Sequence, residues 1–253
     1  MARSTIGSLL QPQSGNIRIE RRAWRCLEDC QAKLRLTEIP FPIPVDTWIE
    51  TVFDIGFGVT NLAHLGPHVL GAAYIEQREI LVAETVQSNE GRFRFTCGHE
   101  LGHFVLHSHL AGIFKDGELP SPDLANRWER QADRFAAAFL SPLTMFEREL
   151  WRICDMAKLD AEHCLTELLM PTAASLWLWS GWFVPALMHR FGLSKAAAVF
   201  RCCDLRLAHD EERRLMPFRV RDALLGRQPF GESVDSIRLV DGRPTRLDSR
   251  SAP

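Results

Sequence analysis

Apolar residues recur at helical spacing in three long segments of the chain. Residues 17–36, 92–107 and 124–140 each carry an apolar stripe opposite polar residues, which predicts three amphipathic helices. Three prolines within residues 39–44 exclude a helix interior there, and a shorter helix is predicted over residues 48–57, closed by Gly58. Two apolar runs, residues 72–76 and 80–84, flank a polar turn and predict a β-hairpin.

These elements indicate an α+β fold whose parts follow one another along the chain. Residues 1–15 are predicted to be a polar tail, and residues 16–150 combine the long helices with a small antiparallel sheet. Residues 151–212 are predicted to be a helical extension, with helix-turn-helix-like punctuation at residues 191–194. Residues 213–253 mix Arg, Pro, Gly and Ser, and are predicted to be a tail with little core.

Composition and charge exclude several classes of protein. The 253 residues are 46% hydrophobic and 25% charged, which is typical of a globular chain and not of a disordered or coiled-coil one. A net charge of −2 gives no overall attraction to nucleic acid or to an anionic membrane. The seven cysteines contain no Cys-x-x-Cys pair, and the N-terminal residues lack a sustained apolar segment. We therefore expect a reducing compartment.

One stretch is apolar enough to raise the question of a membrane span. Residues 168–188 carry no charged side chain, and a segment of that length can cross a bilayer. However, Pro171 and Pro185 interrupt it, and Trp177, Trp179 and Trp182 lie in its middle, whereas membrane tryptophans gather at the interfaces. We expect a helical segment that is buried or that faces a partner, and no membrane span.

The residues that carry chemistry lie in the predicted helix 92–107. Residues 99–103 read H-E-L-G-H, and histidines four positions apart project from the same face of a helix. His99 and His103 are therefore candidate ligands of one zinc ion, which binds imidazole nitrogen well. Glu100 lies beside them and can take a proton from a water molecule. His107 and His109 are too far along an unbroken helix to reach the same ion, so helix-end or supporting roles are expected for them.

A catalytic zinc site needs a third protein ligand, and the candidate is Glu129 in the predicted helix 124–140. Asp133, one turn later, can accept the free N–H of a ligating histidine. Gly98 and Gly102 in the first helix and alanines at 136–138 in the second predict a close approach of the two helices. The alternative for Glu129 is an exposed salt bridge with a neighbouring arginine.

The sequence RFRFTCGHELGHFVLH, followed by WERQADRFAAAFLSP, resembles the ImmA/IrrE family of zinc metallopeptidases. The resemblance covers about residues 17–150 and departs from the family pattern at Cys97 and in the tryptophan-rich residues 165–184. It implies a zincin-like fold with an H-E-x-x-H active-site helix and a Zn²⁺ cofactor held by His99, His103 and Glu129. It also implies a cytoplasmic endopeptidase that cleaves a helix-turn-helix transcriptional repressor, with Glu100 as the catalytic base.

Contacts to the substrate are less well defined by the sequence. An extended peptide can add to the edge of the predicted hairpin through backbone hydrogen bonds. Tyr74, the single tyrosine, and His64 are candidates for contacting the substrate or the developing oxyanion, and structural roles remain open for both.

Two other functions remain open at this stage. The first is a DNA-binding regulator that reads bases from the helix at residues 195–205, where Lys195 and Arg201 are the candidate contacts. Few side chains there suit base reading, so direct contact with nucleic acid is not expected. The second is a partner-docking regulator whose zinc site is structural or inactive. The sequence leaves the oligomeric state and the activating signal open.

Overall fold

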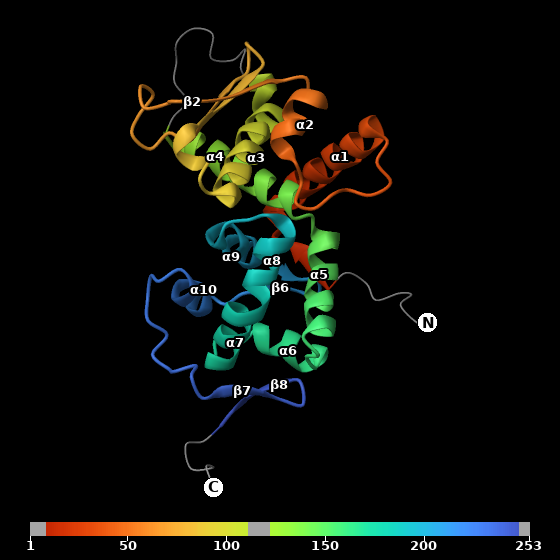
Figure 1. Ribbon diagram of the computed structural model, residues 1–253, viewed down its shortest axis with the longest axis vertical. Coiled ribbons are helices and arrows are strands. Elements are labelled where there is room, and N and C mark those ends of the chain that lie inside the picture. Colours follow the sequence, from red (N-terminus) through yellow and green to blue (C-terminus); the bar gives the residue numbers. More distant parts are fainter. Residues whose placement is uncertain (1–8, 111–121, 248–253) are drawn as a thin grey trace. The chain divides into compact units, whose positions relative to one another are not determined.

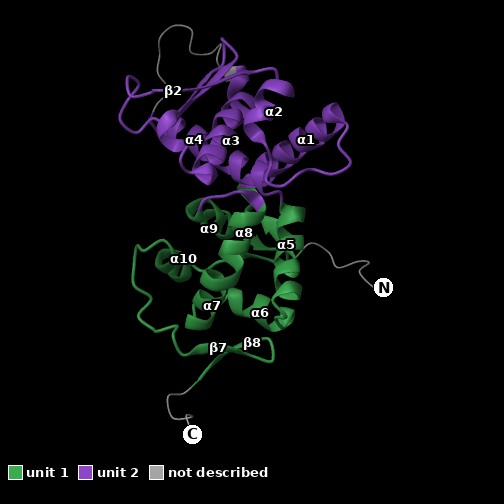
Figure 2. Cartoon of the chain, in the orientation of Figure 1, with its two compact units in different colours: residues 1–15, 143–190, 195–253 green, residues 16–142, 191–194 purple. Residues whose placement is uncertain are grey.

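The computed structural model describes residues 9–110 and 122–247, and its fold is α+β (Figure 1). The chain divides into two compact units (Figure 2). Unit 2 consists of residues 16–142 and 191–194, and unit 1 of residues 1–15, 143–190 and 195–253. Most of the predicted loop at 115–123 lies outside the described residues.

Unit 2 contains the three predicted long helices and the predicted hairpin. Its elements are α1 (Ile17–Leu34), α2 (Val45–Thr51), β2 (Gly56–Thr60), β3 (Gly71–Tyr74), β4 (Glu79–Ala83), the short helix η2 (Glu84–Val86), α3 (Glu90–His107), the short helix η3 (Ser108–Leu110) and α4 (Pro122–Leu140). The side chain of Asn89 caps α3 by accepting the backbone N–H of Arg92 at 3.0 Å. The chain returns to unit 2 at residues 191–194, where the carbonyl of Gly192 accepts from Arg94.

The sheet of unit 2 is mixed, which corrects the prediction of an antiparallel sheet. Its strand order is β2-β4-β3, with β3 antiparallel and β2 parallel to the central β4. The observed helix, α2, ends at Thr51, whereas the prediction extended it to residue 57. The last two residues of the predicted helix, Gly56 and Phe57, belong to β2. Asp54 adopts φ +54° between the two elements, and the β-favouring Ile55, Phe57 and Val59 alternate with small residues. This period-two pattern favours a strand over the helix.

The packing of α3 against α4 depends on small residues at their contact. A Cβ added at Gly98 would lie 3.3 Å from the Cβ of Ala136, and one added at Gly102 would lie 3.1 Å from the Cα of Ala132. Both helices bury this face, where Ala132, Ala136 and Leu101 are fully buried. The predicted close approach is therefore confirmed, and it brings the H-E-x-x-H face of α3 beside α4.

Unit 1 is mostly helical and carries two small sheets. Its elements are β1 (Leu10–Pro12), α5 (Leu143–Met156), α6 (Ala161–Leu168), α7 (Ala173–Leu178), a π-helical turn η4 (Trp179–Phe183), α8 (Val184–Phe191, whose last residue belongs to unit 2), α9 (Lys195–Asp204), β5 (Leu205–Leu207), β6 (Asp210–Arg214), α10 (Phe218–Leu224), β7 (Ile237–Val240) and β8 (Arg243–Arg246). Strands β1, β5 and β6 form one sheet, and β7 pairs with β8 in another.

Both segments predicted to be tails contribute to the structure of unit 1. Leu10 is buried in β1, which pairs antiparallel with β5. In the C-terminal segment, Met216 and Val220 are fully buried, and β7 and β8 are joined by a turn at Asp241 and Gly242 in which both residues have positive φ. An Asp-Gly pair with two positive φ angles forms the tight turn that suits a hairpin. The segment after residue 213 thus has more core than its composition predicts.

The tryptophan-rich segment belongs largely to the core of unit 1. Trp179 is fully buried, and its indole N–H donates to the carbonyl of Leu168 at 3.1 Å. Trp177 and Trp182 are half-buried and contact each other edge to face. Within the described ranges, no helix is both long and apolar enough to cross a membrane.

The helices at the predicted helix-turn-helix-like punctuation are present as α8 and α9, which flank residues 192–194. However, Arg201, a candidate base-reading residue, is 3% exposed. A side chain buried to this degree does not reach a base edge, so α9 retains only Lys195 of the two candidates on its surface.

We expect Gly102→Val to destabilise the protein, because the added methyl groups would meet the backbone of Ala132. Overpacking of this kind costs about 1–3 kcal/mol of unfolding free energy, which denaturant titration measures. Arg92→Val, at an exposed position of the same helix, controls for the substitution itself. Equal stability of the two variants would contradict the close approach of α3 and α4.

Candidate metal centre

The two histidines of the H-E-x-x-H motif and Glu129 meet at one point. His99 and His103 come from successive turns of α3, and Glu129 comes from α4. The Nε2 atoms of the two histidines are 3.1 Å apart. Glu129 Oε2 lies 3.1 Å from His99 Nε2, and Glu129 Oε1 lies 3.5 Å from His103 Nε2. The three predicted ligands are therefore brought together, and Glu129 directs its carboxylate to the histidines.

The spacing of these atoms fits a zinc ion. Tetrahedral zinc with bonds of about 2.0–2.2 Å places its ligand atoms about 3.3–3.6 Å from one another. The distances of 3.1, 3.1 and 3.5 Å lie close to that range. Two imidazole nitrogens and one carboxylate oxygen form a donor set that is found in catalytic zinc sites, where the fourth position is left for water or substrate. Candidate ligands and geometry thus both fit the metal.

Asp133 lies where the sequence predicts it, behind His99. Its Oδ1 is 2.9 Å from His99 Nδ1 and can accept the ring N–H, which directs Nε2 toward Glu129. Burial alone would lower the pKa of His99, but hydrogen bonds to Asp133 and Glu129 raise it to about 10. Hydrogen bonding to His99 in turn lowers the pKa of Glu129. The acidic side chains therefore favour a positive charge at this point of the structure.

His103 has the opposite electrostatic environment. Burial and the neighbouring charge of His99 lower the pKa of His103 to about 4, which keeps its ring neutral. Its Nδ1 lies 3.1 Å from Nδ1 of His107, and His107 Nε2 lies 3.0 Å from Gln131 Oε1. A neutral imidazole has a lone pair to offer a metal ion, as a ligand requires.

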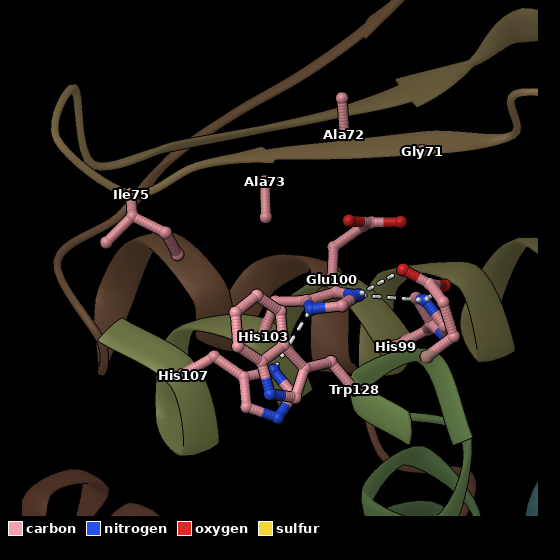
Figure 3. A pocket seen from close by; sticks show the side chains of 10 residues that line it. Gly71, Ala72, Ala73, Ile75, His99, Glu100, His103, His107 and Trp128 are labelled. Carbon is pink, nitrogen blue, oxygen red and sulfur yellow. Dashed lines mark hydrogen bonds and ion pairs between the residues drawn. The ribbon is translucent and has the colours of Figure 1, made fainter. Parts of the chain in front are cut away.

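Glu100 projects from α3 toward β3, which crosses above the histidines (Figure 3). Its residue is 6% exposed, and a Cβ added at Gly71 of β3 would come within 2.8 Å of its Cγ and Cδ. Burial raises the pKa of Glu100 to about 7, with His99 lowering it and Glu129 raising it further. A carboxyl group with a pKa near neutrality can both take up and release a proton in the same reaction.

A cavity of about 380 Å³ lies between β3 and the two helices. It is lined by Gly71, Ala72, Ala73, Ile75, His99, Glu100, His103, His107, Trp128 and Glu129. Ala73 and Ile75 point toward the histidines, whereas Ala72 points away from them (Figure 3). β3 is an edge strand of its sheet, and three of its residues line this cavity. Glu100 and all three candidate ligands thus face the same cavity.

Tyr74 and His64 do not line this cavity. Tyr74 is half-buried in β3, one position away from the cavity-facing Ala73 and Ile75, and alternation along a strand turns it to the other face. His64 is exposed in the segment between β2 and β3. The structure therefore does not place either side chain beside Glu100. His109, in η3, is also exposed and lies outside the ligand group.

Several residues of the site were not identified from the sequence. Gly71 and Ala73 belong to the site because their small size allows β3 to lie close to α3. The sequence pattern of a hairpin does not reveal which face of a strand packs toward the helix. Gln131 and Trp128 contact His107, as a hydrogen-bond partner and as a stacked ring at 5.6 Å between centroids. Trp128 is half-buried at the cavity, although its helical stripe predicts a core position. The supporting role expected for His107 agrees with its place behind His103.

Comparison with known proteins gives a family for this arrangement. A search of curated proteins found no match. Among solved structures, a Mycobacterium tuberculosis transcriptional regulator aligns with 16% identity and a TM-score of 0.44 over 78% of this chain. The alignment covers 48% of that protein, so this chain spans about half of its length. The family model of the peptidase M78 group, described as the IrrE N-terminal-like domain, matches residues 52–202. That match includes α3, α4 and every candidate ligand, and the chain therefore belongs to the IrrE N-terminal-like family of metallopeptidase-type domains.

Proposed function

We propose that this protein is a zinc-dependent endopeptidase that cleaves a helix-turn-helix transcriptional repressor and so relieves repression. The observation that carries the enzymatic part is the convergence of His99, His103 and Glu129 beside a buried glutamate with a pKa near 7. Family membership supports the same reaction class. The repressor as substrate rests on the resemblance of the sequence to the ImmA/IrrE family.

His99, His103 and Glu129 would hold the zinc ion. When bound, zinc acts as a Lewis acid toward the scissile carbonyl and lowers the pKa of water. Glu100 takes a proton from the attacking water as its oxygen bonds to the carbonyl carbon. The same carboxyl then delivers that proton to the amine as the C–N bond breaks. Burial of Glu100 raises its pKa and so makes both transfers feasible near neutral pH.

A protein substrate fits the strand that borders the cavity. β3 is an edge strand, and an extended peptide can pair with such an edge through its backbone while alternate side chains enter the cavity. Gly71 and Ala73 are small, so a peptide paired with β3 could approach Glu100 and the histidines closely. The exposed side chain of Glu129, 59% accessible, leaves the ligand group open on one side.

Zinc should stabilise the folded chain, because it binds ligands from two helices that separate on unfolding. At a free zinc concentration of about one hundred times Kd, the gain is about 2.7 kcal/mol, visible as a rise in melting temperature that a chelator reverses. His103→Ala should lose this response. His109→Ala, which alters an exposed histidine outside the ligand group, should keep it. An unchanged response in His103→Ala would reject the assigned ligands.

Glu100→Gln should keep zinc while cleavage falls by several orders of magnitude, because the amide cannot accept the proton. The assay incubates the protein with candidate helix-turn-helix repressors from neighbouring genes, with and without chelator, and reads the fragments by mass spectrometry. Glu90→Gln, an exposed glutamate of the same helix, serves as the control. Cleavage by Glu100→Gln at the wild-type rate would disprove the mechanism. Absence of chelator-sensitive cleavage of any repressor would disprove the substrate.

Gly71→Ala should lower kcat/KM by about 100-fold, because the new methyl group would displace the Glu100 carboxylate and a misplacement of about 1 Å can have that effect. Zinc content should not change, because the three atoms nearest to a Cβ added at Gly71 all belong to Glu100 and none belongs to a candidate ligand. In Gly56→Ala, another glycine of the same sheet, the added Cβ makes its shortest contact at an ordinary 3.5 Å, so this variant should behave as wild type. Full activity of Gly71→Ala would show that the position of Glu100 is not fixed by β3.

A further inference from the structure

His103 begins a hydrogen-bonded row of three side chains that leads away from the candidate metal position. His103 Nδ1 faces His107 Nδ1 at 3.1 Å, and His107 Nε2 faces Gln131 Oε1 at 3.0 Å (Figure 3 shows the two histidines). The row begins on α3 and ends on α4, as the pair of His99 and Asp133 does. Each candidate ligand histidine of α3 therefore has hydrogen-bonded support from α4.

The direction in which protons are arranged along this row decides whether His103 can bind a metal. If Gln131 Oε1 accepts the Nε2–H of His107, a neutral His107 has a lone pair at Nδ1. That lone pair accepts the Nδ1–H of His103, and His103 Nε2 then keeps a lone pair facing His99 and Glu129. In the reverse order the Gln131 amide nitrogen donates, His107 donates from Nδ1, and the proton of His103 lies on Nε2. Only the first order leaves the nitrogen at the ligand group free to coordinate.

The surroundings hold His107 in place for this contact. Its residue is 7% exposed, and its ring stacks on Trp128 at an interplanar angle of 30°. Gln131 lies on α4 two positions after Glu129, so the same helix that supplies a ligand also supports the row. A buried ring with both nitrogens in hydrogen bonds has little freedom to turn.

We propose that His107 and Gln131 are positioning residues that fix the Nδ1–H tautomer of His103 and direct its Nε2 to the zinc ion. The proposal rests on the zinc site of the proposed function, but it does not depend on peptide cleavage. The His107–Gln131 pair orients the ring of His103 as the Asp133 carboxylate orients the ring of His99. The difference is that the groups behind His103 are neutral, whereas Asp133 is charged.

The first test is the zinc affinity of the full chain, measured by competition with a chromogenic chelator. His107→Phe keeps a planar ring against Trp128 but removes the acceptor, and zinc affinity should fall by about 10–100-fold. His109→Phe makes the same change at an exposed histidine and should leave affinity within about two-fold of wild type. Equal affinities of the two variants would overturn the proposal.

A second pair of variants tests the direction of the protons. Gln131→Leu removes the acceptor and should weaken zinc binding, whereas Gln131→Glu supplies an acceptor that cannot donate and should retain it. Nitrogen-15 shifts of the histidine rings in the zinc-loaded wild-type protein give a direct readout that needs no variant. They should show His103 protonated at Nδ1 and His107 protonated at Nε2, and protonation of His107 at Nδ1 would overturn the proposal.

These outcomes separate the two proposals. A wild-type protein that binds zinc with the expected tautomers but cleaves no peptide would contradict the endopeptidase and leave the positioning role intact. A wild-type protein that cleaves its substrate while His107→Phe holds zinc as tightly as before would contradict the positioning role alone.

Discussion

The candidate site depends on the distance between α3 and α4. Three ligand atoms must lie about 3.4 Å apart to share one zinc ion, yet two of them come from α3 and the third from α4. Gly98 and Gly102 allow this approach because they place no side chain against Ala136 and Ala132. Glycine in a helix interior lowers helix stability by about 1 kcal/mol relative to alanine, and burial of the alanine-rich face of α4 offsets that loss. Two residues of α3 with low helix propensity thus allow the candidate ligands of the two helices to meet.

Two side chains of α4, Asp133 and Gln131, give the two candidate ligand histidines different surroundings. Asp133 adds negative charge beside His99 and raises its pKa, while burial and the charge of His99 lower the pKa of His103 and keep its ring neutral. His107 and Gln131, the next side chains of its hydrogen-bonded row, add no negative charge there. A metal cation between the two histidines would therefore have the carboxylate of Asp133 behind His99 and only neutral groups behind His103. Glu100 is placed between these environments and the edge strand β3, where burial raises the pKa of its carboxyl group. Different neighbours therefore determine the charge at His99, the proposed tautomer of His103 and the burial of Glu100.

The sequence predicts the long helices and the residues that meet at the candidate metal centre because their signals are local. The spacing of His99 and His103 and the apolar stripes of α1, α3 and α4 follow directly from helix periodicity, and the small residues at the contact indicate its closeness. The strand β2 was missed because its parallel partner, β4, is separated from it in sequence by β3. Whether Tyr74 faces the cavity is not decided by the sequence, because tertiary packing determines which face of β3 borders the cavity. The Asp241-Gly242 turn, by contrast, is a local hairpin signal that a composition-based reading of the C-terminal segment overlooks.

Neither unit is a continuous piece of chain, and this has a consequence for synthesis on the ribosome. Unit 2 takes its last residues from positions 191–194, where Gly192 receives a hydrogen bond from Arg94 of α3. Unit 1 takes strand β1 from the beginning of the chain and pairs it with β5. A nascent chain that has passed residue 142 therefore still lacks part of unit 2, and β1 must wait for residues 205–207 to emerge. Folding of the two units is therefore expected to finish late and close together in time.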